Sequence, residues 1–162
     1  MDEETALKKA RYMVLRLLTF RARSVKEVAE YLERKSFTAA VTEATIKKMI
    51  EYGYLDDHKF ASDYAAYRKL RGYGLIKVRY ELINKGIARQ VIDSEIDRQF
   101  NPDEDLVRIK ELLNKKIPDD EQIDERWLAR QVSFLKRRGF QDNLIITALQ
   151  DYPLKYYRKF PK

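Results

Sequence analysis

The sequence contains no cysteine, so disulfide bridges and thiolate metal sites are excluded. No apolar run approaches the roughly 20 residues that a membrane helix needs. Residues 1–4 are acidic where a signal peptide would begin with bases. We therefore expect these 162 residues to form a cytoplasmic protein that does not associate with a membrane.

The motifs of common enzyme classes are missing as well. The sequence has no glycine-rich phosphate loop, no nucleophile elbow and no HExxH motif. Carboxylates and an imidazole meet only at Asp56, Asp57 and His58, which could be read as metal ligands or as an acid and base. Neighbouring positions on a helix point apart, and aspartates before a helix usually cap it. We expect two capping aspartates and a surface histidine, with no enzymatic activity, no metal and no cofactor.

Positive charge is concentrated in the middle of the chain. The whole sequence has 33 bases and 26 acids, a net charge of +7, and residues 59–98 hold nine of these bases and five of these acids. No acid lies between Asp63 and Glu81, a window that holds five bases. A solvated face would also be basic, but this density favours contact with a polyanion. The five bases are Arg68, Lys69, Arg71, Lys77 and Arg79.

Tyrosines alternate with these bases. Tyr64 shares a helical face with Phe60, so we expect it in the core. For Tyr67, Tyr73 and Tyr80 two interpretations stay open. They could stack on unpaired bases, at about 1–3 kcal/mol for each base, or they could pack between helical units.

Apolar residues recur at helical spacing along most of the chain, and no alternating pattern predicts strands. Ser24 and Glu27 have the spacing of a capping box at the start of a helix. Thr42 is predicted to cap the helix that follows. Helices alone are therefore expected.

A pattern with a period of about 50 residues relates three parts of the chain. Residues 32–37, 82–87 and 135–140 each run from a leucine through a base to a glycine or serine and then an apolar residue. This predicts an all-α protein of three tandem three-helix repeats forming an elongated, curved array. The predicted repeats cover residues 6–55, 57–100 and 103–152, and a basic, aromatic tail follows at 153–162.

The repeat pattern adds four bases to the candidate contact surface. Lys85 lies at the end of the second repeat's middle helix, and Lys136, Arg137 and Arg138 lie at the equivalent turn of the third. Turns at matching positions of stacked repeats would project from one side. We therefore include these residues with the central bases as candidates for binding a partner or DNA.

One motif in the middle of the chain resembles the RecX family of bacterial regulatory proteins. It begins with Gly-Tyr-Leu-Asp-Asp, continues with Phe-Ala and a glycine, and ends with Glu-Leu and Lys-Gly-Ile. Its residues are Gly53, Tyr54, Leu55, Asp56, Asp57, Phe60, Ala61, Gly74, Glu81, Leu82, Lys85, Gly86 and Ile87. The likeness extends more thinly from about residue 6 to residue 152.

The resemblance implies a monomeric, non-enzymatic modulator of the RecA recombinase in DNA repair. It implies binding to RecA on single-stranded DNA, with double-stranded DNA as a further partner, and inhibition as the main effect. Whether the protein assists RecA under some conditions stays open. The alternative is a stand-alone DNA-binding module, because three-helix units can contain a helix-turn-helix.

Overall fold

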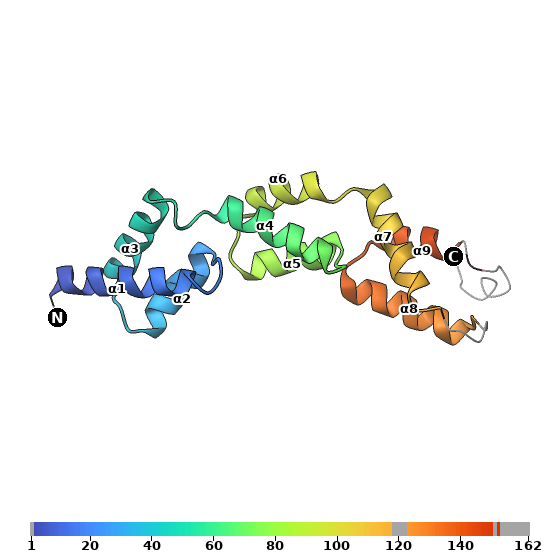
Figure 1. Ribbon diagram of the computed structural model, residues 1–162, viewed down its shortest axis with the longest axis horizontal. Coiled ribbons are helices and arrows are strands. Elements are labelled where there is room, and N and C mark those ends of the chain that lie inside the picture. The colour runs from blue at the N-terminus through green and yellow to red at the C-terminus, as the bar shows by residue number, and fades with distance from the viewer. Residues whose placement is uncertain (1, 118–122, 151, 153–162) are drawn as a thin grey trace. The chain divides into compact units, whose positions relative to one another are not determined.

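The computed structural model describes residues 2–117, 123–150 and 152, and all regular secondary structure in these ranges is helical (Figure 1). This confirms the predicted all-α class. No helix among these residues is long and apolar enough to cross a membrane. The predicted tail at 153–162 lies outside the described residues. The helices are α1 (Glu3–Leu18), α2 (Val25–Arg34), α3 (Ala39–Glu51), α4 (Asp57–Leu70), α5 (Leu75–Asn84), α6 (Arg89–Gln99), α7 (Pro102–Asn114), α8 (Glu125–Arg138) and α9 (Asp142–Leu149).

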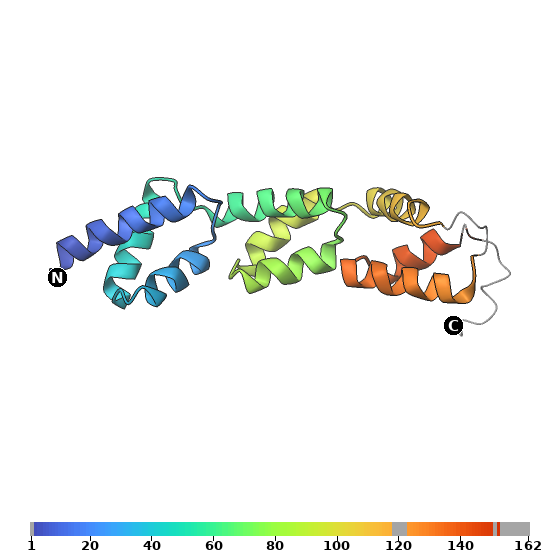
Figure 2. The ribbon, with the colours of Figure 1, turned by 60° about the horizontal axis from the view of Figure 1, so that its bottom comes forward.

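The chain divides into two compact units, and unit 1 comprises Met1–Tyr64 and Glu81–Glu95. In this unit α3 packs against both α1 and α2, as both ribbon views show (Figure 1 and Figure 2). The apolar stripes of these helices meet in one core. Its buried members are Ala6, Ala10, Val14, Val28, Leu32, Val41, Met49 and Leu55.

Of the two helix caps predicted in unit 1, the cap of α2 is confirmed and the cap of α3 is wrong. Ser24 and Glu27 form the predicted capping box, in which each side chain accepts a hydrogen bond from the other residue's N–H. Helix α3 is capped by Thr38, whose hydroxyl accepts a bond from the Val41 N–H. The predicted cap, Thr42, lies one turn inside that helix and is buried. Both threonines precede an apolar run, so spacing alone could not separate them.

Unit 2 comprises Ala65–Tyr80 and Ile96–Lys162. Here α9 packs against α7 and α8 around a second core. The Trp127 indole N–H donates to the Lys116 carbonyl at 3.0 Å, so the largest core side chain has its polar atom satisfied. The buried members of this core are Ile109, Leu113, Trp127, Leu128, Leu135, Phe140, Leu144, Ile145, Ala148 and Leu149.

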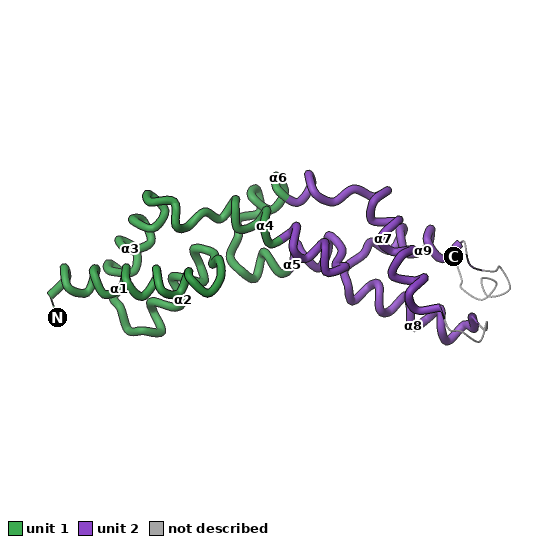
Figure 3. The backbone as a smooth tube through the Cα atoms, in the orientation of Figure 1, with its two compact units in different colours: residues 1–64, 81–95 green, residues 65–80, 96–162 purple. Residues whose placement is uncertain are grey.

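The compact units do not coincide with the helix triplets read from the sequence. Figure 3 shows that the division between the units falls within α4, α5 and α6. Each unit therefore combines a terminal triplet with part of the middle one. The repeat boundaries at 6–55, 57–100 and 103–152 stay a prediction.

Candidate partner-binding site

The two basic segments predicted in the middle and last repeats lie together in unit 2. The Gly74 N–H donates to the Arg138 carbonyl at 2.8 Å, and the Ile76 N–H donates to the Gly139 carbonyl at 3.0 Å. A Cβ atom on Gly74 would collide with the backbone of Gly139. Glycine is therefore required at this close approach. We call this contact between residues 71–77 and 138–140 the unit 2 joint.

The guanidinium of Arg138 holds the turn before α5 from the side. It donates to the carbonyls of Arg71 at 2.7 Å and Gly72 at 3.2 Å. It also lies 4.8 Å from the ring centre of Tyr73, and the Arg68 guanidinium lies 3.6 Å from the same ring. Cations pack favourably against aromatic rings. Arg68, Arg138 and the half-buried Tyr73 thus form part of the protein's own packing.

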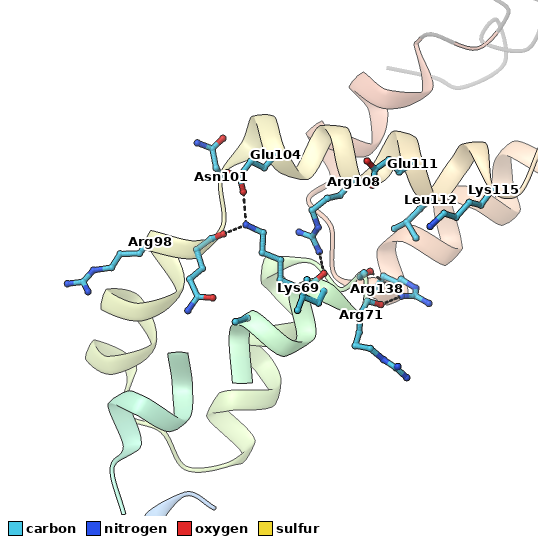
Figure 4. A pocket seen from close by; sticks show the side chains of 14 residues that line it. Lys69, Arg71, Arg98, Asn101, Glu104, Arg108, Glu111, Leu112, Lys115 and Arg138 are labelled. Carbon is cyan, nitrogen blue, oxygen red and sulfur yellow. Dashed lines mark hydrogen bonds and ion pairs between the residues drawn. The ribbon is translucent and has the colours of Figure 1, made fainter. Parts of the chain in front are cut away.

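Lys69 is likewise engaged by its surroundings, between the end of α6 and the first turn of α7 (Figure 4). Its ammonium donates to the Gln99 carbonyl and pairs with Glu104 at 2.6 Å. This contact lowers the pKa of the Glu104 carboxyl. Lys69 therefore fastens α4 to the start of α7.

Arg108 on α7 completes the polar contacts of this region. It donates to the carbonyls of Lys69 at 2.9 Å and Tyr73 at 2.6 Å, and it pairs with Asp105 at 2.5 Å. Burial raises the pKa of the Asp105 carboxyl, although the Arg108 charge acts in the opposite direction. One charged donor thereby satisfies a carbonyl in the last turn of α4 and another in the turn before α5.

Unit 1 contains a second joint of the same kind, between residues 24–27 and 84–87. The Ser24 hydroxyl donates to the Lys85 carbonyl at 2.6 Å, and Gly86 lies so close to Lys26 that a Cβ atom would collide with it. The Lys85 ammonium pairs with Glu27 at 3.2 Å. In each joint the C-terminal end of one helix meets the N-terminal start of another: α8 meets α5 in unit 2, and α5 meets α2 in unit 1. The base before the glycine, Arg138 or Lys85, helps to hold the two ends together.

Lys85 also reaches two rings on α4. Its ammonium lies 5.8 Å from the ring centre of Phe60 and 5.2 Å from that of Tyr64. Tyr64 is half-buried, stacks on Phe60 at 5.8 Å, and donates its hydroxyl to Glu81 at 3.0 Å. Tyr64 therefore packs on Phe60, but it is half-buried and is not one of the buried core residues that the sequence predicted it to be.

Most of the family motif has a structural role in unit 1. Gly53 and Gly86 have positive φ angles of 73° and 78°, which end α3 and α5 in the left-handed conformation. The motif's apolar positions are buried, whereas Tyr54 is exposed. These buried residues are Leu55, Phe60, Ala61, Leu82 and Ile87.

The two aspartates of the motif cap different helices. Asp56 accepts a hydrogen bond from the Lys59 N–H at 3.0 Å and caps α4, as expected. Asp57 instead accepts from the Val25 N–H of α2 at 2.9 Å, so the expectation that it caps the following helix is wrong. Burial raises the pKa of the Asp57 carboxyl, and the Val25 N–H acts against this.

His58 is exposed and its ring lies 3.8 Å from Glu95. Within the described ranges, no three histidine, cysteine or acidic side chains gather closely enough to hold a metal ion. The carboxylates of Asp56 and Asp57 accept hydrogen bonds from N–H groups in the first turns of α4 and α2, which is the role of helix caps.

The remaining candidates differ in exposure. Arg71, Lys136 and Arg137 are exposed, and Lys136 pairs with Asp142 at 3.2 Å. Lys77 and Arg79 are half-buried, and Arg79 pairs with Asp97 at 3.3 Å. Tyr67 and Tyr80 are more than half exposed, at 54% and 60%. Exposed bases and exposed aromatic rings thus occur in unit 2, the same unit as the unit 2 joint.

Sequence reasoning missed three bases that surround the end of α4. Arg98, Arg108 and Lys115 line a hollow there together with Lys69, Arg71 and Arg138 (Figure 4). Arg98 lies on α6, Arg108 on α7 and Lys115 directly after α7, all outside the acid-free window, where nearby acids lower the local net charge. Only the packing of helices that are distant in the sequence brings them together around the end of α4.

Comparison with known proteins gives the same family as the motif. A model of the RecX first three-helix domain matches residues 10–49, and a model of the RecX second three-helix domain matches residues 56–94. The chain is similar to Regulatory protein RecX of Chlorobium phaeobacteroides, with 32% identity over 88% of this chain and 92% of that protein. It is also similar to Regulatory protein RecX of Trichlorobacter lovleyi, with 30% identity over 81% of this chain and 87% of that protein.

A solved structure shows the same fold. The crystal structure of RecX from Lactobacillus salivarius superposes with a TM-score of 0.78 at 18% identity, over 91% of this chain and 97% of that one. The helical repeats, the motif at residues 53–87 and these relatives agree, and the chain belongs to the RecX family of regulatory proteins.

Proposed function

We propose that this protein binds the RecA recombinase assembled on single-stranded DNA and modulates that filament, mainly by inhibition. The observation that carries the proposal is membership of the RecX family, with similarity over 88% of the chain. The exposed bases of unit 2 support it, because both DNA and an acidic protein surface would attract them. Catalysis by this chain is not part of the proposal.

The contact surface that we propose is smaller than the set of bases in the sequence. Lys69, Lys85 and Arg138 are engaged in holding the fold together. Arg71 and Arg137 are exposed, and Lys77, within the unit 2 joint, is half-buried. We assign partner contact first to Arg71, Lys77 and Arg137, with the exposed rings of Tyr67 and Tyr80 beside them.

Regulation by binding needs only a difference in affinity. A protein that prefers one state of the filament shifts the filament toward that state by no more than that preference. Contacts made by lysine and arginine with phosphates release counterions from the nucleic acid, and this release is less favourable at a higher salt concentration. We therefore expect binding to the filament to weaken steadily as the salt concentration rises.

Co-sedimentation with preformed filaments tests this proposal. The protein is mixed with cognate RecA on single-stranded DNA, and the bound fraction is measured for the natural chain and for the triple variant Arg71→Ala, Lys77→Ala, Arg137→Ala. We expect the triple variant to bind at least about tenfold more weakly, because three charged contacts are lost.

A second triple variant, Lys9→Ala, Lys47→Ala, Arg126→Ala, is the control. It removes the same charge from exposed positions outside the proposed surface. We expect it to bind like the natural chain. Equal weakening of both variants would refute the assignment of the surface. Tight binding to naked duplex DNA without any dependence on RecA would favour the stand-alone DNA-binding module.

A further inference from the structure

A hollow of about 870 Å³ opens in unit 2 beside the end of α4. Its walls come from the last turn of α4, the turn before α5, the end of α6, one face of α7, and the Arg138 side chain (Figure 4). Bases outnumber acids among the lining side chains, with Glu104 and Glu111 as the two acids. The six lining bases are Lys69, Arg71, Arg98, Arg108, Lys115 and Arg138.

These bases fall into two groups. Lys69, Arg108 and Arg138 are hydrogen-bonded to backbone carbonyls, so their positions are set by the fold. Glu104 and Asp105 offset the charges of Lys69 and Arg108. The other three bases, Arg71, Arg98 and Lys115, are exposed. The hollow therefore combines a pre-organised wall with additional positive charge that is open to solvent.

The hollow also carries an apolar side chain. Leu70 lines it and is 87% exposed, the highest value for a large apolar residue in the described part of the chain. Leu112 lines it too and is half-buried. Burying an exposed leucine against a second apolar side chain is favourable by about 25 cal/mol for each Å² removed from water. A ligand that fits would thus offer an apolar group among its negative charges.

Two kinds of polyanion could be attracted here, and the lining side chains separate them. Single-stranded nucleic acid is held by bases stacking on aromatic rings. None of the described side chains that line the hollow is aromatic. An acidic peptide needs cations for its carboxylates and an apolar contact for an anchoring side chain, and both are present.

We propose that this hollow binds an extended acidic peptide segment of a partner protein. Carboxylates of the peptide pair with Arg71, Arg98 and Lys115, and an aliphatic or aromatic side chain of the peptide packs on Leu70. The proposal specifies the chemistry of the partner and does not depend on which protein supplies the segment. It is therefore tested separately from filament binding.

Fluorescence anisotropy with a defined probe tests the proposal. The probe is a labelled peptide of about twelve residues in which a central Leu-Phe pair is flanked by aspartates and glutamates. It is titrated with the full chain at about 0.15 M salt, where charges beyond about 8 Å are screened. We expect saturable binding, weakened at least about tenfold by Arg98→Glu with Lys115→Glu and about threefold or more by Leu70→Ala.

The matched control reverses two exposed bases elsewhere, Lys47→Glu with Arg126→Glu. It has the same net charge as the pocket variant, and we expect its affinity for the peptide to stay within about twofold of the natural chain. Circular dichroism confirms that each variant keeps its helices. The proposal is overturned if the natural chain does not bind the probe saturably, or if the control loses as much affinity as the pocket variant. It is also overturned if the pocket variant loses affinity for a labelled single-stranded oligonucleotide and keeps it for the peptide.

Discussion

Replacing Glu27 with glutamine tests how strongly one carboxylate stabilises the joint between residues 24–27 and 84–87. The Glu27 carboxylate accepts hydrogen bonds from Arg21 at 2.8 Å, the Ser24 N–H at 3.0 Å and Lys85 at 3.2 Å. Its side chain is 18% exposed. Glutamine keeps the shape and can still accept the Ser24 hydrogen bond, so the substitution removes the charge while leaving the capping box.

The pKa of Glu27 sets the size of the expected effect. Burial alone would raise this pKa, but the hydrogen bonds from Arg21, the Ser24 N–H and Lys85 outweigh burial and lower it from 4.5 to about 2. A difference of that size corresponds to at most about 3.4 kcal/mol, at about 1.4 kcal/mol for each tenfold change. Part of the surroundings is open to water, and solvent screening reduces the contribution to about 1–2 kcal/mol.

The sign of the pH dependence follows from the lowered pKa. Because the folded state binds the Glu27 proton less readily than the unfolded state, the stabilisation is complete above pH 4.5 and is lost as the pH falls toward about 2. Urea unfolding followed by circular dichroism measures the difference in unfolding free energy between the natural chain and Glu27→Gln. We expect about 1–2 kcal/mol near pH 7, falling to about a quarter of that at about pH 2.5.

The control for this experiment is Glu30→Gln on the same helix. Glu30 is 48% exposed and lies 3.8 Å from Lys26, so its loss should change stability by less than about 0.5 kcal/mol. The reasoning is refuted if Glu27→Gln behaves like Glu30→Gln near pH 7. The reasoning is also refuted if the difference in unfolding free energy between the natural chain and Glu27→Gln stays constant between about pH 7 and about pH 2.5.

Further predictions concern the glycines and Asp57. Gly139 and Gly53 both have positive φ, 84° and 73°, but a Cβ atom on Gly139 would collide with the Lys77 backbone whereas one on Gly53 would meet nothing. We expect Gly53→Ala to lower the free energy of unfolding by about 1 kcal/mol and Gly139→Ala to lower it clearly more, as measured by thermal unfolding. Equal losses for the two variants would contradict the close backbone contact in the unit 2 joint. Asp57→Ala should cost about 1 kcal/mol because the Val25 N–H loses its acceptor. Asp57→Asn should change stability by less than about 0.5 kcal/mol near pH 7, since burial already disfavours the charge, and a loss as large as that of Asp57→Ala would contradict this.

Much of the fold follows from local patterns. Val28 and Leu32 are both buried on one face of α2, as their spacing predicts, and Ser24 with Glu27 forms the expected box. These predictions succeed because helix periodicity and capping involve residues within about one turn of each other. The predicted cap of α3 was wrong because Thr38 and Thr42 are both threonines before an apolar run, and the local sequence does not distinguish them.

The site was less predictable because it depends on contacts between distant residues. Arg138 and Arg71 are 67 positions apart, yet the guanidinium of one bonds the carbonyl of the other. Sequence cannot tell that Arg138 is engaged in this way while Arg137 beside it is exposed. The basic window located the region, and packing determined which of its charges face solvent.

The most direct test of the proposed regulation is RecA ATP hydrolysis on single-stranded DNA, measured with the cognate RecA while this protein is added at fixed salt. We expect hydrolysis to fall at amounts well below one protein for each RecA. The variant Arg71→Ala, Lys77→Ala, Arg137→Ala should largely restore the rate. Hydrolysis that stays unchanged at every ratio, together with tight binding of the protein to naked duplex DNA, would contradict the account.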